Sequence, residues 1–179
     1  NLAQVCNGRN LVILDCSGSM TWPMKDARTG RSFGNCIKKA GLTASTIVQA
    51  TNADVIRCGL EAEYAEPMNG RNLFEYSQYL SRADMGCTNL AAAFDLIISE
   101  NKEYDRIFIL SDNECNCGRQ ARAYADYIRR VNSPYIYSID LAAYGSKPLE
   151  NTNKVFYYYG YGISMFEDIA RNEFDPNFH

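Results

Sequence analysis

The chain has 179 residues, a length that suits one domain with a substantial apolar core. It is 46% hydrophobic, and its 18 basic and 21 acidic residues leave a net charge of −3, so no general attraction to nucleic acid or anionic membranes is expected. No apolar run approaches the roughly 20 residues that cross a bilayer, and the first ten residues do not resemble a signal peptide. Because the sequence does not begin with Met, we expect residues 1–179 to be a single domain excised from a larger protein.

The cysteine and histidine content limits the chemistry that the chain can perform. Seven cysteines cannot all pair internally, and their scattered spacing predicts reduced thiols and a cytoplasmic location. Cys115 and Cys117 form the one close pair, and a zinc site would need two further ligands. The single histidine, His179, is the last residue, a poor position for a catalytic base. Ser–His–Asp and Cys–His mechanisms are therefore not expected.

Short apolar segments alternate with helical patterns along the chain. We predict strands over residues 10–15, 105–111, 135–141 and 154–160, with a bent strand or hairpin over residues 53–65. Helices are predicted over residues 41–51, 73–82, 89–101, 118–131 and 164–172. Wholly apolar strands such as "LVIL" and "IFIL" are typical of a parallel sheet covered on both faces. The pattern predicts an α/β fold with a doubly wound, mostly parallel central sheet flanked by helices.

Residues 21–40, "TWPMKDARTGRSFGNCIKKA", form the longest stretch that we predict to be irregular, because it contains a proline, glycines and several charges. Long loops within compact domains tend to be functional or disordered. This one follows the first strand directly, so we expect it to shape the selectivity of any site there.

Polar residues follow the ends of two predicted central strands. Asp15 and Asp112 end these strands, Ser17 and Ser19 follow the first, and Thr88 precedes a helix. If the strands are neighbours, all five residues converge where ligands bind in open α/β sheets. Two carboxylates and three hydroxyls are hard oxygen donors, which suit Mg²⁺ or Mn²⁺ better than Zn²⁺ or Cu²⁺. The alternative is that these side chains only cap turns and satisfy backbone groups.

The motif "DCSGS" at residues 15–19 matches the Asp-x-Ser-x-Ser signature of von Willebrand factor A domains. Thr88 and Asp112 match the isolated threonine and the late aspartate of that family in the expected order. The chain thus resembles a von Willebrand factor A domain over nearly its whole length. The resemblance implies a Rossmann-like fold and a metal-ion-dependent adhesion site (MIDAS) formed by the five residues, with a partner protein that offers an exposed acidic residue to bound Mg²⁺ or Mn²⁺.

Two further segments, "MGCTNLAAAFDLI" and "DRIFILSDNECN", resemble the C-terminal A domain of the Ro (TROVE) ribonucleoprotein family. Proteins of that family bind non-coding RNA through a ring of helical repeats, which this sequence lacks. The resemblance implies a non-enzymatic module of an RNA-binding protein, in which the parent protein rather than this domain alone contacts non-coding RNA.

Two other functions stay open from the sequence. A Mg²⁺-dependent phosphohydrolase could use Asp15 as nucleophile, but the usual second acid two residues later is replaced by Ser17. Direct RNA binding by this domain could use an arginine stripe on the helix at 118–131 or the aromatic run "VFYYYGY" at 155–161. We expect the arginines to lie on a solvated helix face and the aromatic run to be a packed strand.

Overall fold

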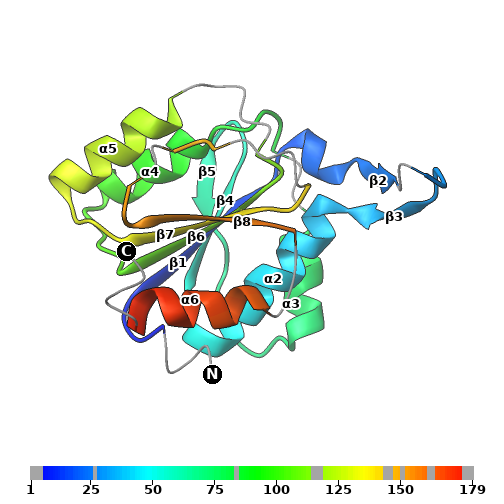
Figure 1. Cartoon of the computed structure of the whole chain (residues 1–179), viewed down its shortest axis with the longest axis horizontal. Coiled ribbons are helices and arrows are strands. Elements are labelled where there is room, and N and C mark those ends of the chain that lie inside the picture. The colour runs from blue at the N-terminus through cyan, green and yellow to red at the C-terminus, as the bar shows by residue number, and fades with distance from the viewer. Residues whose placement is uncertain are drawn as a thin grey trace.

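The computed structural model describes residues 6–25, 28–82, 85–113, 119–142, 147–149, 152–160 and 164–174. Six strands form the central sheet in the order β5-β4-β1-β6-β7-β8 (Figure 1). Their bounds are β1 Asn10–Asp15, β4 Asp54–Cys58, β5 Ala62–Tyr64, β6 Arg106–Ser111, β7 Tyr135–Asp140 and β8 Val155–Tyr159. All neighbouring pairs are parallel except β4 and β5, which form an antiparallel hairpin. The predicted fold class and the hairpin within residues 53–65 are confirmed.

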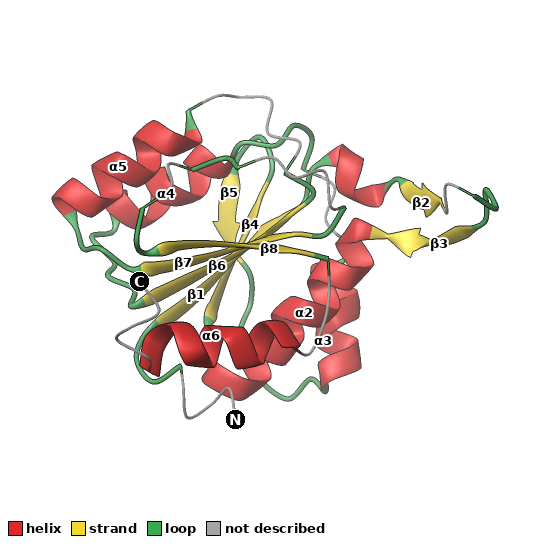
Figure 2. Ribbon diagram, in the orientation of Figure 1, coloured by secondary structure: helices red, strands yellow, loops and turns green. Residues whose placement is uncertain are grey.

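Helices cover both faces of the sheet (Figure 2). One face packs against α2 (Cys36–Thr51), α3 (Leu73–Leu80) and α6 (Ser164–Phe174), and the other against α4 (Leu90–Ser99) and α5 (Gln120–Arg130). No helix within the described ranges is both long and apolar enough to cross a membrane.

The alternation of side chains along β1 divides the apolar core into two layers. Val12 and Leu14 belong to the layer beneath α2, α3 and α6, whereas Leu11 and Ile13 belong to the layer beneath α4 and α5. All four side chains are fully buried. A central strand that is covered on both faces must be apolar at every position, which explains the continuous apolar run in its sequence.

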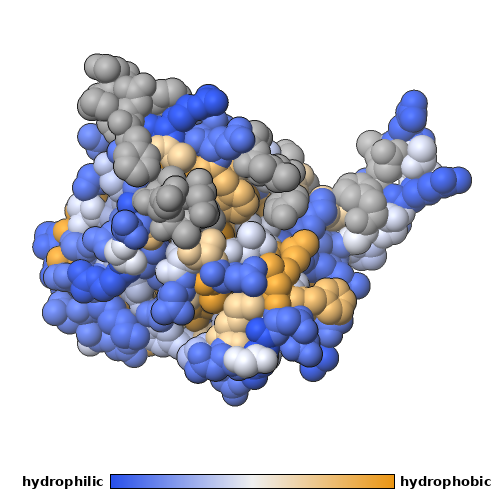
Figure 3. Space-filling model, turned by 90° about the horizontal axis from the view of Figure 1, so that it is seen from below, coloured by the Kyte–Doolittle hydropathy of each residue, from blue (hydrophilic) through white to orange (hydrophobic). Residues whose placement is uncertain are grey.

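The prediction that residues 21–40 are irregular is wrong. A 3-10 turn, η1 (Gly18–Thr21), leads into a small antiparallel hairpin of β2 (Pro23–Lys25) and β3 (Ser32–Asn35), and α2 begins at Cys36. The helix starts there because the side chain of Asn35 caps it by accepting a hydrogen bond from the Lys38 N–H. Figures 1 and 2 show this hairpin projecting from the body, and it also stands out when the molecule is seen from below (Figure 3).

Candidate functional site

The topology brings two of the predicted site residues to the same edge of the sheet. β1 and β6 are parallel neighbours, with Leu14 paired to Leu110, so their carboxyl ends meet. Asp15 is the last residue of β1, and Asp112 follows the last residue of β6. Both side chains are buried, and the charge of Asp112 contributes to raising the pKa of Asp15. The expectation that these strands are neighbours is confirmed.

Neutral donors hold the carboxylate of Asp15 in place. Its Oδ1 accepts a hydrogen bond of 2.9 Å from the Ser17 N–H, and its Oδ2 accepts one of 2.6 Å from the Ser111 hydroxyl. The Ser111 hydroxyl in turn accepts a bond of 2.9 Å from the Asn113 N–H. Burial raises the pKa of Asp15, and the hydrogen bonds from Ser111 and Ser17 oppose that rise. The carboxylate is therefore oriented by contacts that leave its oxygens further capacity to accept.

The two serines of the motif lie side by side. The Oγ atoms of Ser17 and Ser19 are 3.2 Å apart, close enough for either hydroxyl to donate to the other. The tight turn of η1 produces this approach, because the Met20 N–H donates to the Ser17 carbonyl and the Trp22 N–H donates to the Ser19 carbonyl. Ser17 is buried, whereas Ser19 is partly exposed, so solvent reaches the pair from the Ser19 side.

The loop over residues 85–89 carries Thr88 and is called the threonine loop below. Its backbone is bound to the turn that carries Ser17 and Ser19. The Met85 N–H donates to the Cys16 carbonyl, and the Gly18 N–H donates to the Gly86 carbonyl, both at 2.9 Å. Thr88 itself is buried, with 2% of its surface exposed. The structure thus brings the threonine loop, the two serines and the two aspartates to one edge of the sheet.

Gly59, which the sequence analysis missed, allows the threonine loop to approach the end of β4. A Cβ added at Gly59, which follows β4, would lie 2.3 Å from the Met85 carbonyl oxygen and 2.4 Å from the Met85 Cβ. Leu60 also donates its N–H to that carbonyl at 2.8 Å. Only a residue without a side chain fits here, and no local sequence pattern reveals the requirement.

A third buried acid at this edge was also missed. Asp140 ends β7, lies beside Ser111 in the register of β6 and β7, and accepts a hydrogen bond of 3.0 Å from the Ala142 N–H. Burial raises the pKa of the Cys36 thiol to about 11, and the charges of Asp112, Asp140 and Asp15 add to that rise. The signal that pointed to the other two aspartates, an acid at the end of an apolar strand, was present in "YSID" as well.

The donor set at this edge fits a hard cation. Among the described residues, no three or more His, Cys, Asp or Glu side chains lie close enough together to hold a metal ion. A metal here would therefore need hydroxyl oxygens as well as carboxylates, which is the combination that Ser17, Ser19 and Asp15 present. Neutral hydroxyl and anionic carboxylate oxygens are ligands that Mg²⁺ and Mn²⁺ accept and that softer metals do not prefer.

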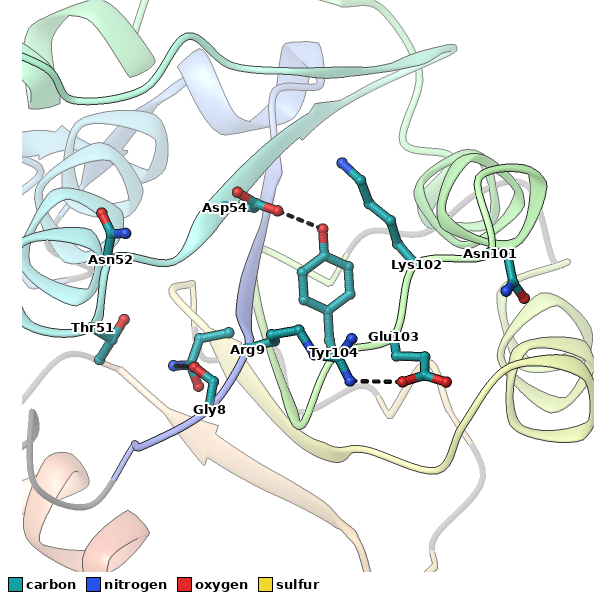
Figure 4. A pocket seen from close by; sticks show the side chains of 10 residues that line it. Gly8, Arg9, Thr51, Asn52, Asp54, Asn101, Lys102, Glu103 and Tyr104 are labelled. Carbon is teal, nitrogen blue, oxygen red and sulfur yellow. Dashed lines mark hydrogen bonds and ion pairs between the residues drawn. The ribbon is translucent and has the colours of Figure 1, made fainter.

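A polar pocket of about 440 Å³ lies at the opposite edge of the sheet (Figure 4). Its charged groups have partners within the chain: Arg9 pairs with Glu103 at 2.7 Å, Lys102 pairs with Glu100 at 3.2 Å, and the Tyr104 hydroxyl donates to Asp54 at 2.7 Å. None of the predicted site residues lines this pocket.

The structure also places the features that suggested RNA binding. Arg119 and Arg129 are exposed and pair with Asp95 and Asp126, so they lie on the solvated helix face that we expected. In the aromatic run, the ring of Phe156 stacks on Tyr137 at 5.5 Å, as expected for a packed strand, whereas Tyr159 is exposed and Tyr161 lies outside the described residues.

Five of the seven cysteines, Cys6, Cys16, Cys36, Cys58 and Cys87, are free thiols. Cys115 and Cys117, together with His179, lie outside the described residues.

Comparison with known proteins finds similar folds. The Ro (RSR) protein of Deinococcus radiodurans is 19% identical with a TM-score of 0.71, and the match covers 93% of this chain but only 35% of the Ro protein. The BatB protein of Bacteroides thetaiotaomicron is 12% identical with a TM-score of 0.61, covering 92% and 96% of the two chains. Proximal thread matrix protein 1 of the mussel byssus, with a zinc-occupied MIDAS motif, is 10% identical with a TM-score of 0.55, covering 92% and 46%. No protein-family model and no curated protein sequence matches the chain.

Proposed function

Because the chain has the fold of a von Willebrand factor A domain similar to that of the Ro protein, we propose that it is a divalent-cation-dependent binding module. The proposed metal is Mg²⁺ or Mn²⁺, the ligands are Asp15, Ser17, Ser19, Thr88 and Asp112, and the partner is a protein that offers an exposed carboxylate. The chain spans about a third of the Ro protein, so binding of non-coding RNA and a cytoplasmic location are proposed for the parent protein rather than for this domain alone.

One observation carries the proposal. The hydroxyls of Ser17 and Ser19 lie 3.2 Å apart at the carboxyl end of the strand whose last residue, Asp15, is oriented by Ser111. Serines that only satisfied backbone groups would not need to face each other beside an anchored carboxylate.

The proposed ligand set leaves room for one oxygen from a partner. When bound, Mg²⁺ prefers six oxygen ligands, so the five side chains would leave one position that a carboxylate of a partner protein can fill. The chain's own residues set the geometry: Ser111 and the Ser17 N–H orient Asp15, and the backbone bonds of Met85 and Gly18 hold the threonine loop in place.

The same contacts argue against the phosphohydrolase alternative. Both oxygens of Asp15 accept hydrogen bonds, and its side chain is fully buried, so it is poorly placed to attack a phosphorus atom. Ser17 occupies the position where such enzymes have their second acid. Turnover of an aryl phosphate in Mg²⁺ would contradict the binding-module proposal.

The experiment is a titration of the domain with Mg²⁺ and Mn²⁺ by calorimetry and thermal shift, because a ligand that binds the folded state raises the unfolding temperature. We expect Ser17→Ala and Asp112→Asn to abolish binding. The matched control is Ser45→Ala, which removes another buried serine hydroxyl, one that donates to the Gly41 carbonyl within α2. Absence of binding by the native chain, or unchanged binding by Ser17→Ala, would overturn the proposal.

A further inference from the structure

The β2–β3 hairpin is anchored next to the proposed metal site. It follows η1, the turn that carries Ser19, and projects away from the sheet (Figure 1). The side-chain amide of Asn35 donates to the Thr21 carbonyl at 3.3 Å, which holds the two ends of the hairpin together. Met24 packs against the core and contacts the thiol of Cys36, with the two sulfur atoms 3.6 Å apart. The base of the hairpin is therefore fixed relative to Ser19.

The hairpin is basic in an acidic chain. The hairpin, residues 23–35, contains three Lys or Arg and one Asp, whereas the whole chain has a net charge of −3. Lys25, Arg28 and Arg31 are exposed, and hydrophilic side chains cover much of the projection (Figure 3). Within the described ranges, neither Lys25 nor Arg31 has an ion-pair partner. Lys25 and Arg31 can therefore pair with an external anion.

Two large apolar side chains are exposed beside the same site. Trp22, with 67% of its surface exposed, follows Ser19 in the turn, and its N–H donates to the Ser19 carbonyl. Leu60, with 62% exposed, lies against the threonine loop through its bond to the Met85 carbonyl. Tryptophan and arginine are the residues most enriched at the energetic centres of protein interfaces. The exposed Trp22 beside this edge therefore offers an aromatic anchor to a partner.

We propose that the hairpin, Trp22 and the metal site form one composite surface that binds an acidic segment of a partner protein. This inference rests on the proposed metal-binding function and extends it. One carboxylate of the partner binds the ion, further acidic side chains pair with Lys25 and Arg31, and an apolar side chain packs on Trp22. Lys25 is three residues beyond Trp22, about 10 Å along an extended strand, a distance that a peptide segment bound at the metal site can span.

An acidic protein segment fits this surface better than RNA does. Binding of a nucleic acid needs cations along a continuous track of phosphates. Here the exposed cations Lys25, Arg28 and Arg31 lie on a short hairpin, and the edge of the sheet beside it holds the buried acids Asp15, Asp112 and Asp140. A short segment with a few well-placed acidic residues matches this limited patch.

The test is a selection from a phage-displayed library of random dodecapeptides on the domain in Mg²⁺, with elution by EDTA. We expect the selected peptides to contain several Asp or Glu residues and one large apolar residue.

The affinity of the best peptide is then measured by fluorescence anisotropy. We expect it to fall by about tenfold or more in Lys25→Glu/Arg31→Glu and in Trp22→Ala, because opposed charges and a central aromatic anchor dominate such interfaces. The matched control, Arg122→Glu/Arg130→Glu on α5, reverses two exposed cations elsewhere and should bind normally.

The outcomes separate this inference from the metal site itself. If Mg²⁺ binds and Ser17→Ala abolishes peptide binding while the hairpin variants bind normally, the composite surface is overturned and the metal function stands. Peptide binding that needs the hairpin but persists in EDTA would also overturn the composite surface. Failure to select any peptide would overturn the proposal of an acidic protein partner. So would hairpin-dependent binding of a ten-nucleotide oligouridine that is tighter than binding of the best peptide.

Discussion

Buried charge is balanced differently where the parallel strands begin, at the amino edge of the sheet, and where they end, at its carboxyl edge. At the amino edge, the buried guanidinium of Arg106, at the start of β6, forms a bidentate ion pair with Glu173 of α6, and the Tyr137 hydroxyl donates to the same carboxylate at 2.7 Å. At the carboxyl edge, Asp15 is held by the hydroxyl of Ser111 and the backbone N–H of Ser17, and the charge of Asp112 acts on it unfavourably. The first arrangement completes its charge balance within the chain. The second holds a carboxylate in position, and an external cation would stabilise it.

This contrast separates an acid that stabilises the fold from one that would serve the proposed metal binding. Breaking a buried ion pair leaves one charge without compensation in a low-dielectric interior. A carboxylate held by neutral donors costs less to alter, but its orientation decides whether a metal can use it. Substitutions at the amino edge should therefore act on unfolding, and those at the carboxyl edge mainly on metal affinity.

The largest expected effect is at the amino edge. Glu173→Gln should lower the free energy of unfolding by about 3 to 5 kcal/mol, because it leaves the buried Arg106 guanidinium uncompensated. Urea denaturation measures the change. Asp95→Asn, which removes the partner of the exposed Arg119, should cost less than about 1 kcal/mol. A loss below about 1 kcal/mol for Glu173→Gln, or a loss of Mg²⁺ affinity in a protein that remains folded, would break the contrast between the edges.

The second prediction concerns the hydrogen bond from Ser111 that orients Asp15 at the carboxyl edge. Ser111→Ala should weaken Mg²⁺ binding by about 10- to 100-fold, because it removes the bond that orients one carboxylate oxygen. Its cost in stability should be about 1 to 3 kcal/mol, since a buried acceptor loses its donor. Calorimetry measures the change in Mg²⁺ affinity, and urea denaturation measures the change in the free energy of unfolding.

Ser138→Ala is the matched control for Ser111→Ala. Ser138 lies on the neighbouring strand β7, is buried, and its hydroxyl has no hydrogen-bond partner among the described residues. Its removal should leave Mg²⁺ affinity unchanged. Equal effects of the two substitutions would show that Ser111 acts through packing alone.

The third prediction concerns the close approach of the threonine loop to Gly59. Gly59→Ala should cost about 1 to 3 kcal/mol of stability and reduce Mg²⁺ affinity, because the added methyl group overlaps the Met85 carbonyl and pushes the loop away. Gly18→Ala is the control, since a Cβ there meets no atom within 4 Å although the residue lies inside the motif. Unchanged metal affinity in a folded Gly59→Ala protein would show that the position of the loop does not matter.

The last prediction is a dependence of stability on alkaline pH. Burial raises the pKa of the Cys16 thiol, beside Asp15, from its usual 9.0 to about 12. Above pH 9 the unfolded chain loses this proton while the folded chain keeps it, so stability falls as pH rises from about 9 to 12. The slope from this thiol is at most about 1.4 kcal/mol per pH unit. Urea denaturation across this range should show a shallower slope for Cys16→Ala, and an identical slope would remove Cys16 as the cause.

Local patterns predicted most of the fold. Wholly apolar runs identified β1 and β6, and helical periodicity identified α4, whose buried residues Leu90, Ala93, Phe94 and Ile97 lie on one side. The same patterns failed in residues 21–40, because strands of three or four residues have too little periodicity to be distinguished from a loop. The cap at Asn35 was the signal that would have placed the start of α2 correctly.

The sequence alone determined which residues end the two central strands and that hydroxyls follow one of them, because these signals are local. Tertiary structure decided how the edge is assembled. The bond from Ser111 to Asp15 joins residues 96 positions apart, and the approach of Met85 to Gly59 depends on how a loop crosses the end of a neighbouring strand. Strand order places Asp140 at the same edge, and the fold exposes the basic side chains of the projecting hairpin. Contacts of this kind arise from the packing of distant segments, so no window of sequence contains them.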